Sequence, residues 1–531
     1  MSVLVLEVAR QGSQYFPNEV ALARNLFGDL IEKTGAGRIL ALRSDSSNEM
    51  PAGINELAEE LGIKAECLQI DRLDPSSWTG DENPDELWSV HLKNKILGSG
   101  ISPDNRICLL MNAGSNWSAL QLYSLFEIIG GSLWVTESPG DGVPSTATEL
   151  SRKIPEGSMG EDAFAVLAKL GINNRDWYTA SDIQGHYGGT PKPKGVDITL
   201  GSIPDFVEDR ESPDGKEYRL TTSGKYHAML ALASKDRTAK VKKGPRGLVI
   251  FVRSVKESES VVEYLNEHNT DFDSYAFVVG RIAGADEDRT KEISLELHEQ
   301  VRQRTSVGDR VVSSPEDVCF SIPQTGGALE TSVEVMEILH NLRMASRGTE
   351  WSLETSGILG LLRPALYQYS HLAGMPSLFI AREAKGPGVH ENIMEGPMHW
   401  LGSPDKAQIE GIKKILKDSS SGASKFVATA LLLNDSDPNL TMMITKSKDE
   451  DRNPFYDFNH EQFETGHQLR FSDLPKTNSQ YKSLKDKLIK AESLKAVELK
   501  REVVEGSRFE DSFVLTPSGI IAGALLVNKG K

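Results

Sequence analysis

The first part of the chain alternates short apolar runs with segments whose apolar residues recur at helical spacing. The apolar runs predict strands that are buried on both faces of a sheet. They lie at 3–9, 38–42, 65–70, 107–111 and 133–136. Amphipathic helices are expected between them, at 18–33, 54–61, 84–97 and 117–129. Strands that alternate with helices over short connections predict a parallel, doubly wound α/β sheet with right-handed crossovers.

The stretch 106–138 predicts a strand, a loop, a helix and a second strand. The loop Asn112-Ala113-Gly114-Ser115-Asn116 interrupts the apolar run with residues that favour turns and helix N-caps. At the carboxyl edge of a parallel sheet, such a loop and the helix N-terminus behind it suit an anionic ligand such as a phosphodiester. An ordinary strand-to-helix turn is the alternative interpretation.

The chain then repeats its own pattern. Residues 218–233 (YRLTTSGKYHAMLALA) and 513–527 (FVLTPSGIIAGALLV) both carry Leu-Thr-x-Ser-Gly before an apolar helix, roughly 295 residues apart. Residues 350–383 again predict strand, loop, helix and strand, with Thr355-Ser356-Gly357 as the loop. Further strands are expected at 248–252, 275–279 and 318–322, and further helices at 258–266 and 287–304. Matches in the same order predict the duplication of a whole unit.

Each α/β region is followed by an accessory region. In the first, after a linker-like stretch at 139–158, short helices at 179–186 and 196–207 precede a hairpin at 208–220 and a closing helix. This order resembles a winged helix-turn-helix. Because the expected recognition helix carries Asp197 and Asp205 but no Lys or Arg, a scaffold or dimerisation role is favoured over DNA recognition.

The second accessory region is longer. Helices are expected at 406–416 and 423–433, a polar loop or insertion at 435–470, and a Lys-rich amphipathic helix at 481–499. The basic helix makes this region the better candidate for DNA, although a solvated surface helix explains the same pattern. The predicted domains are two Rossmann-like domains at 1–145 and 246–386, and two winged-helix-like domains at 159–243 and 400–531.

Composition narrows the class of protein. A chain of 531 residues is too long for one hydrophobic core, and 39% hydrophobic with 25% charged residues is typical of soluble globular proteins. No apolar run approaches the ~20 residues of a membrane span, and the N-terminal MSVLVLEVA predicts a strand rather than a signal peptide. Cys67, Cys108 and Cys319 fit buried thiols in a reducing cytoplasm, so a cytoplasmic location is expected. The net charge of −17 argues against unspecific coating of nucleic acid.

The sequence lacks the motifs of several classes of enzyme. There is no G-x-G-x-x-G after the first strand and no Walker A motif, so a dinucleotide coenzyme or NTP hydrolysis is poorly supported. A PD-(D/E)xK nuclease needs Glu-x-Lys on a strand to hold Mg²⁺, whereas Glu498-Leu499-Lys500 falls within a predicted helix. The cysteines show no metal-ligand spacing, and no metal site is expected. Enzymatic activity is therefore left open, with a nuclease or a ring nuclease as the classes to consider.

A Rossmann-like domain with a Gly/Ser/Asn loop after its fourth strand, followed by a winged helix, resembles the CARF proteins of type III CRISPR systems. The resemblance implies a cyclic oligoadenylate as ligand, with cyclic tetra-adenylate preferred and no further cofactor. It implies that the ring lies between two CARF-like domains, in a monomeric pseudo-dimer or a homodimer. The loops after strands one and four would contact it. The implied ligand residues are Arg10, Gln11, Gly12, Ser13, Asn112, Gly114, Ser115, Asn116 and Trp117 in the first half, and Arg253, Ser254, Lys256, Thr355, Ser356, Gly357 and Arg363 in the second.

Three functional hypotheses follow. The first is a regulator or adaptor in type III CRISPR antiviral defence, which senses the ring and signals through winged helices that bind double-stranded DNA or a protein partner. The second is a cyclic-oligoadenylate-activated nuclease, or a ring nuclease, with an unrecognised active site. The third is a transcription factor that senses another anionic nucleotide.

Overall fold

The computed structural model describes the parts of the chain needed to place both sheets and most of their helices. The described residues are 1–8, 16–43, 49–70, 96–97, 99–101, 105–114, 116–137, 143–151, 177–185, 197–198, 200–201, 203–236, 244–252, 254–282, 287–314, 317–322, 327–380, 383–384, 392–393, 398–401, 406–417, 441–448, 454–459, 490–494, 496–504, 508–515, 519, 522 and 525.

The first half folds into a six-stranded sheet of order β3-β2-β1-β4-β5-β6. Its strands are β1 (Ser2–Glu7), β2 (Ala36–Arg43), β3 (Lys64–Gln69), β4 (Arg106–Leu110), β5 (Ser132–Glu137) and β6 (Thr146–Glu149). The first five are parallel, and β6 pairs antiparallel with β5. The helices α1 (Val20–Thr34), α2 (Ala52–Leu61) and α4 (Asn116–Ile129) lie between the strands along the chain. Residues 3–6 of the central strand β1 are at most 1% exposed, because helices cover both faces of a parallel sheet.

A second sheet has the same topology, with order β12-β11-β10-β13-β14-β17. Its strands are β10 (Arg246–Val252), β11 (Ser274–Ile282), β12 (Cys319–Ile322), β13 (Glu350–Glu354), β14 (Ser377–Ile380) and β17 (Met398–Leu401), of which β17 alone is antiparallel. Its helices are α9 (Val255–Glu267), α10 (Glu287–Arg304), α11 (Ala328–Ala345) and α12 (Arg363–Ala373). The prediction of two parallel-strand α/β sheets is therefore confirmed.

Strand pairing fixes how the two halves correspond. Ser2 pairs with Arg106 in the first sheet, and Arg246 pairs with Glu350 in the second. At the next strand pair, Leu109 pairs with Leu133, and Leu353 pairs with Ser377. Both sets of pairs are related by a constant shift of 244 residues, so the strand-helix-strand segments 106–133 and 350–377 match without insertion.

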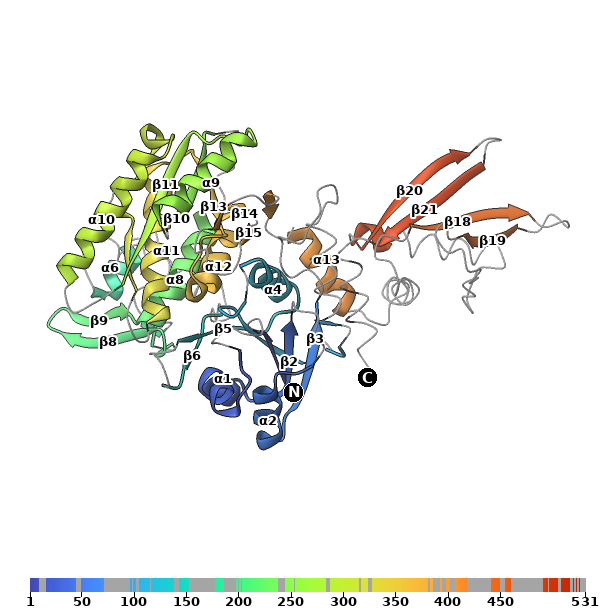
Figure 1. Ribbon diagram of the computed structural model, residues 1–531, viewed down its shortest axis with the longest axis horizontal. Coiled ribbons are helices and arrows are strands. Elements are labelled where there is room, and N and C mark those ends of the chain that lie inside the picture. The colour runs from blue at the N-terminus through green and yellow to red at the C-terminus, as the bar shows by residue number, and fades with distance from the viewer. Residues whose placement is uncertain are drawn as a thin grey trace.

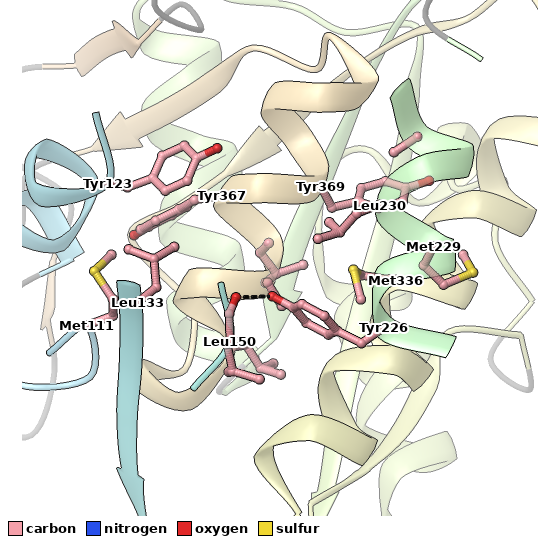
Figure 2. Close-up of a cluster of buried hydrophobic side chains, with 14 of the residues drawn as sticks. Met111, Tyr123, Leu133, Leu150, Tyr226, Met229, Leu230, Met336, Tyr367 and Tyr369 are labelled. Carbon is pink, nitrogen blue, oxygen red and sulfur yellow. Dashed lines mark hydrogen bonds between the residues drawn. The ribbon is translucent and has the colours of Figure 1, made fainter. Parts of the chain in front are cut away.

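The two halves pack through the helices that follow the fourth strand of each sheet. In Figure 1, α4 of the first half lies beside α12 of the second half, between the two sheets. Figure 2 shows the side chains at this junction, where Tyr123 on α4 lies next to Tyr367 on α12. One continuous hydrophobic core therefore spans the two halves, and it includes Met111, Leu133, Met336 and Tyr369.

The region after β6 is partly described. It contains β7 (Tyr178–Thr179), α6 (Ala180–Gly185), the hairpin β8 (Val207–Ser212) and β9 (Gly215–Leu220), and α8 (Thr222–Asp236), with strand order β7-β9-β8. The hairpin and the closing helix are confirmed. Thr179 caps the short helix, since its Oγ1 accepts the Asp182 N–H at 3.2 Å. The expected helix at 196–207 ends earlier, because Val207 already belongs to β8.

The closing helix α8 packs on the opposite half of the chain. It contacts α11 and α12 of the second half, and it is buried almost all round. Tyr226 on α8 donates its hydroxyl to the Leu150 carbonyl at 2.7 Å, as the dashed line in Figure 2 marks. The α13 helix (Lys406–Lys417), which follows the second sheet, packs in turn on α4 of the first half.

The C-terminal region corrects two predictions. The stretch 435–470, expected to be a polar loop, contains β18 (Thr441–Lys448) and β19 (Pro454–Asn459). The helix expected at 481–499 does not reach its predicted end, because β20 (Val497–Val504) begins there and pairs with β21 (Arg508–Leu515). Together these strands form a sheet of order β19-β18-β21-β20. The Lys and Glu residues of 481–499 are typical of a solvated helix face, but the same residue types are also common on the solvent side of a β-hairpin.

One further difference concerns the edge of the first sheet. Residues 139–158 were expected to form a linker, but 146–149 form β6 and complete the first sheet. The helix predicted at 423–433 lies outside the described residues, and so does most of the helix predicted at 84–97.

Candidate ligand site between the two sheets

The loops after the fourth strands of the two sheets lie against each other. The Asn116 side-chain amide, at the first residue of α4, donates to the Ser356 carbonyl at 2.7 Å. On the other side, Gly360 lies against Asn112, where an added Cβ would be 3.1 Å from the Asn112 carbonyl oxygen. The carboxyl edges of the two parallel sheets therefore meet at these loops.

Arg363 makes the longest reach across this junction. It is the first residue of α12, it is 7% exposed, and its Nη1 donates to the carbonyls of Met111 at 3.1 Å and Gly114 at 3.0 Å. A 3-10 turn at Gly360–Leu362 precedes α12, so the α-helix begins at Arg363. The guanidinium fixes the shape of the first loop from the second half of the chain.

Asn112 and Tyr367 hold the same loop from other directions. The Asn112 side chain is tied to β5, since it donates to the Thr136 carbonyl at 2.6 Å and accepts the Thr136 N–H at 3.0 Å. The Tyr367 hydroxyl donates to the Asn116 carbonyl at 3.2 Å. Burial together with the nearby Glu354 charge raises the pKa of the Tyr367 phenol, so this donor keeps its proton at neutral pH.

Two buried carboxylates lie beneath the loops, and neither was singled out from the sequence. Glu7, at the end of β1, accepts a hydrogen bond from the Ser118 hydroxyl, and it leaves no room for a Cβ at Gly114. Glu354, at the end of β13, is fully buried and accepts the N–H groups of Ser356 at 2.7 Å and Gly357 at 3.1 Å. The available signal was an acidic residue that closes an otherwise apolar strand.

A third carboxylate joins the two halves. Both oxygens of Glu137, at the end of β5, accept the N–H of Ala328 at the start of α11, at 3.1 and 3.2 Å. Burial raises the pKa of Glu137, while this hydrogen bond opposes the shift and the Glu330 charge adds to it. A negative group is favourable at a helix N-terminus, so Glu137 links the first sheet to the second through the α11 dipole.

The junction also holds a polar atom that the described residues do not satisfy. Asn116 is 9% exposed, and no described hydrogen-bond partner contacts its Oδ1. The neighbouring Trp117 packs its ring on Phe379 of the second sheet, with ring centroids 5.4 Å apart. A buried carbonyl oxygen beside an aromatic pair offers an acceptor to a ligand amino group.

The structure places the predicted ligand residues as follows. Asn112, Gly114 and Asn116 meet Ser356 and Arg363 at the junction, with Thr355, Gly357 and Trp117 next to them in the chain or in contact. Ser254 instead caps α9, where its Oγ accepts the Glu257 N–H at 3.2 Å, and Lys256 lies in the first turn of that helix. The remaining predicted residues, Arg10, Gln11, Gly12, Ser13, Ser115 and Arg253, lie outside the described residues.

Two searches of the described residues gave no candidates. No group of three or more His, Cys, Asp or Glu side chains is arranged to hold a metal ion within the described part of the chain. None of the helices in that part has the length and apolar character needed to cross a bilayer. The three cysteines are free thiols.

Comparison with known proteins finds only loose structural likenesses to the solved structures described below. Neither a protein-family model nor a curated protein matches the chain. A solved structure described as a type III CRISPR defence DNA nuclease activated by cyclic oligoadenylate aligns with 80% of this chain and 75% of its own, at 11% identity and a TM-score of 0.30. The protein VC1899 from Vibrio cholerae aligns with 65% of this chain and 99% of its own, at 8% identity and a TM-score of 0.17.

Proposed function

We propose that this chain is a ligand-gated regulator or adaptor of type III CRISPR defence that binds a cyclic oligoadenylate between its two CARF-like halves. Cyclic tetra-adenylate is the preferred ring. The observation that carries the proposal is the direct joining of the two strand-four loops, through Asn116 to Ser356 and through Arg363 to Gly114. A ring that contacts both loops binds one arrangement of the two halves better than another, and it therefore shifts the population towards that arrangement.

The constant shift of 244 residues supports a second part of the proposal, that the two halves are copies of one unit. A ligand with repeated nucleotides is suited to a site with an approximate two-fold axis. Fusion of both copies in one chain makes their pairing independent of protein concentration. One ring per chain is therefore the expected stoichiometry.

The hairpin regions support the same duplication. Gly224 and Gly519 are the glycines of the two Leu-Thr-x-Ser-Gly motifs. An added Cβ would strike the Phe206 carbonyl at Gly224 and the Ala496 carbonyl at Gly519. Each of these carbonyls belongs to the residue just before the first strand of a hairpin, β8 or β20. Gly224 and Gly519 thus approach the residue before the hairpin in the same way, and we take the two regions as winged-helix-like modules.

Crosswise packing gives the signal a route outwards. The α8 helix follows the first sheet in sequence but packs on α11 and α12 of the second, while α13 follows the second sheet and packs on α4 of the first. A change in the angle between the halves would therefore move each accessory region relative to the sheet that precedes it. The accessory regions would pass this change to double-stranded DNA or to a protein partner.

The test is a calorimetric titration of the full chain with cyclic tri-, tetra- and hexa-adenylate and with linear oligoadenylates of the same lengths. One cyclic tetra-adenylate per chain at micromolar affinity or better is the expected result. Asn116→Ala is expected to weaken binding at least tenfold, whereas Asn55→Ala, on the exposed face of α2, serves as the matched control. Absence of binding to every ring by folded protein contradicts the proposal and leaves a regulator of another anionic nucleotide.

A nuclease is the second candidate, because of where Glu498 and Lys500 lie. Both belong to β20, where Glu498 pairs with Val514 and Lys500 with Ser512 of β21. The Glu-x-Lys sequence thus lies on a strand, as PD-(D/E)xK nucleases require, and not in the helix predicted from the sequence. Plasmid and single-stranded DNA incubated with Mg²⁺ or Mn²⁺, with and without the ring, distinguish the two functions. Cutting that is lost in Lys500→Ala supports a nuclease, whereas salt-sensitive duplex binding without cutting supports a regulator.

A further inference from the structure

The helices α4 and α12 occupy equivalent positions in the two halves. The strands on either side of each helix are related by the shift of 244 residues. The glycines that end the helices obey the same shift, since Gly130 and Gly374 both adopt a left-handed conformation, with φ of 75° and 70°. Tyr123 and Tyr367 also differ by 244, and they face each other. The approximate two-fold axis that relates α4 to α12 therefore passes close to these two rings.

Other equivalent positions on the two helices carry unlike residues. Glu127 corresponds to His371, and the Glu127 carboxylate lies 3.6 Å from the His371 Nε2. The Glu127 carboxylate also accepts the Tyr123 hydroxyl on its own helix. At the start of the helices, Arg363 of α12 corresponds to Ala119 of α4. The arginine reaches the Met111 and Gly114 carbonyls of the first loop, whereas an alanine side chain is too short to reach across the junction.

These differences decide which halves fit together. If two first halves paired through this face, Glu127 would meet a second Glu127, and the Met111 and Gly114 carbonyls would lose the guanidinium that they now accept. If two second halves paired, His371 would meet His371. Like charges across a closed interface cost free energy, and buried carbonyls without donors cost more.

We infer that the face formed by α4 and α12 is a heterotypic pairing surface, which fits the opposite half of this chain and discriminates against a second copy of the same half. This property does not depend on any ligand. It implies that the two halves have diverged to recognise each other, through Glu127 with His371 and through Arg363 with the first loop. A partner for the first half must therefore present a histidine opposite Glu127, and a partner for the second half must present a carboxylate opposite His371.

The test exchanges the two members of the charged pair in the full chain. Glu127→His places two imidazoles at the axis, and His371→Glu places two carboxylates there. Each single variant places two like side chains at the axis and is expected to lower the Tm by about 2–4 °C. The double variant Glu127→His with His371→Glu restores opposite charges and is expected to return within about 1 °C of the parent.

Two controls separate pairing from general damage. Glu127→Gln removes the charge but keeps the size and an acceptor, so its Tm is expected to fall less than that of Glu127→His. Glu60→His disrupts an exposed ion pair with Arg24, far from the axis in sequence, and is expected to leave the Tm unchanged. If the double variant is no more stable than the less stable single variant, or if both single variants match the parent, the inference is wrong.

Discussion

Tyr123 and Tyr367 pack their rings against each other with centroids 5.9 Å apart, at an interplanar angle of 48°. One ring comes from each half of the chain, and each lies on the helix that follows the fourth strand of its sheet. Tilted aromatic pairs at this distance stabilise an interface beyond their buried area. The two sheets are thus joined where the loops after their fourth strands meet, so the geometry of the joint sets the geometry of these loops.

Replacement of Arg363 is expected to loosen this joint. Arg363→Ala removes the donor of the Met111 and Gly114 carbonyls, which leaves buried acceptors unsatisfied. The loss is expected to be about 2–4 kcal/mol of unfolding free energy. Chemical denaturation of the full chain measures it, and Arg347→Ala, an exposed position after α11, is the matched control. A loss below about 0.5 kcal/mol, as for an ordinary surface substitution, would contradict this role.

Gly114 and Gly130 separate two effects of glycine replacement. Both have positive φ, 77° and 75°, but an added Cβ meets the Glu7 carboxylate at Gly114 and nothing within 4 Å at Gly130. Gly130→Ala is expected to cost about 1 kcal/mol for the backbone conformation alone. Gly114→Ala is expected to cost at least about 2 kcal/mol more, because the buried carboxylate must move. Thermal unfolding of both variants checks the difference, and equal losses would show that Glu7 adapts freely.

Hydrophobic patterning identified the two sheets and the loops after β4 and β13. Buried parallel strands are short, apolar and β-branched, and the glycines that end α4 and α12 are local signals. The strand-four loops were therefore located from sequence, and the structure brings Asn116 next to Ser356 as a consequence of the fold.

The buried carboxylates could not be recognised in the same way. Glu354 accepts three donors from the Ser356-Gly357 loop that follows it, and this depends on how the loop turns back on the strand end. Ser and Gly after a strand fit many loop conformations, so the sequence alone does not distinguish this from a solvated strand end. The bond from Arg363 to the Gly114 carbonyl joins the two halves of the chain, and no local sequence pattern encodes it. Glu498-Leu499-Lys500 shows a different failure, because an alternation of charged and apolar residues fits a helix end and a hairpin strand alike.

Gln368 and Tyr226 form the contact through which the first accessory region meets both halves. The Gln368 amide donates to the Leu150 carbonyl at 2.6 Å and to the Tyr226 hydroxyl at 2.8 Å, and that hydroxyl donates to the same carbonyl. Burial raises the pKa of Tyr226, so the phenol stays a donor.

Tyr226→Phe and Gln368→Leu are each expected to cost about 1–3 kcal/mol, and the double variant less than their sum. A double-mutant cycle in denaturant measures this coupling. Strictly additive losses would mean that the two side chains stabilise the chain independently, and that α8 is not held through this network.

Glu137 is expected to give the chain a distinct pH dependence of stability. Burial raises its pKa in the folded state above the ordinary 4.5. The folded chain therefore holds this proton more tightly than the unfolded chain does. The resulting stabilisation is complete below about pH 4.5 and is lost as the pH rises through the raised pKa.

Glu137→Gln tests this, because glutamine keeps an acceptor for the Ala328 N–H but cannot ionise. The Tm of the variant minus that of the parent is expected to increase from pH 4.5 to pH 7, since only the parent must then bury a charge. Glu330→Gln removes the like charge that helps to raise the pKa of Glu137. In this variant the loss of stability with rising pH is therefore expected at lower pH than in the parent. Parallel Tm profiles of the parent and Glu137→Gln would contradict the raised pKa. They would indicate that the N-terminus of α11 compensates fully for the burial of this carboxylate.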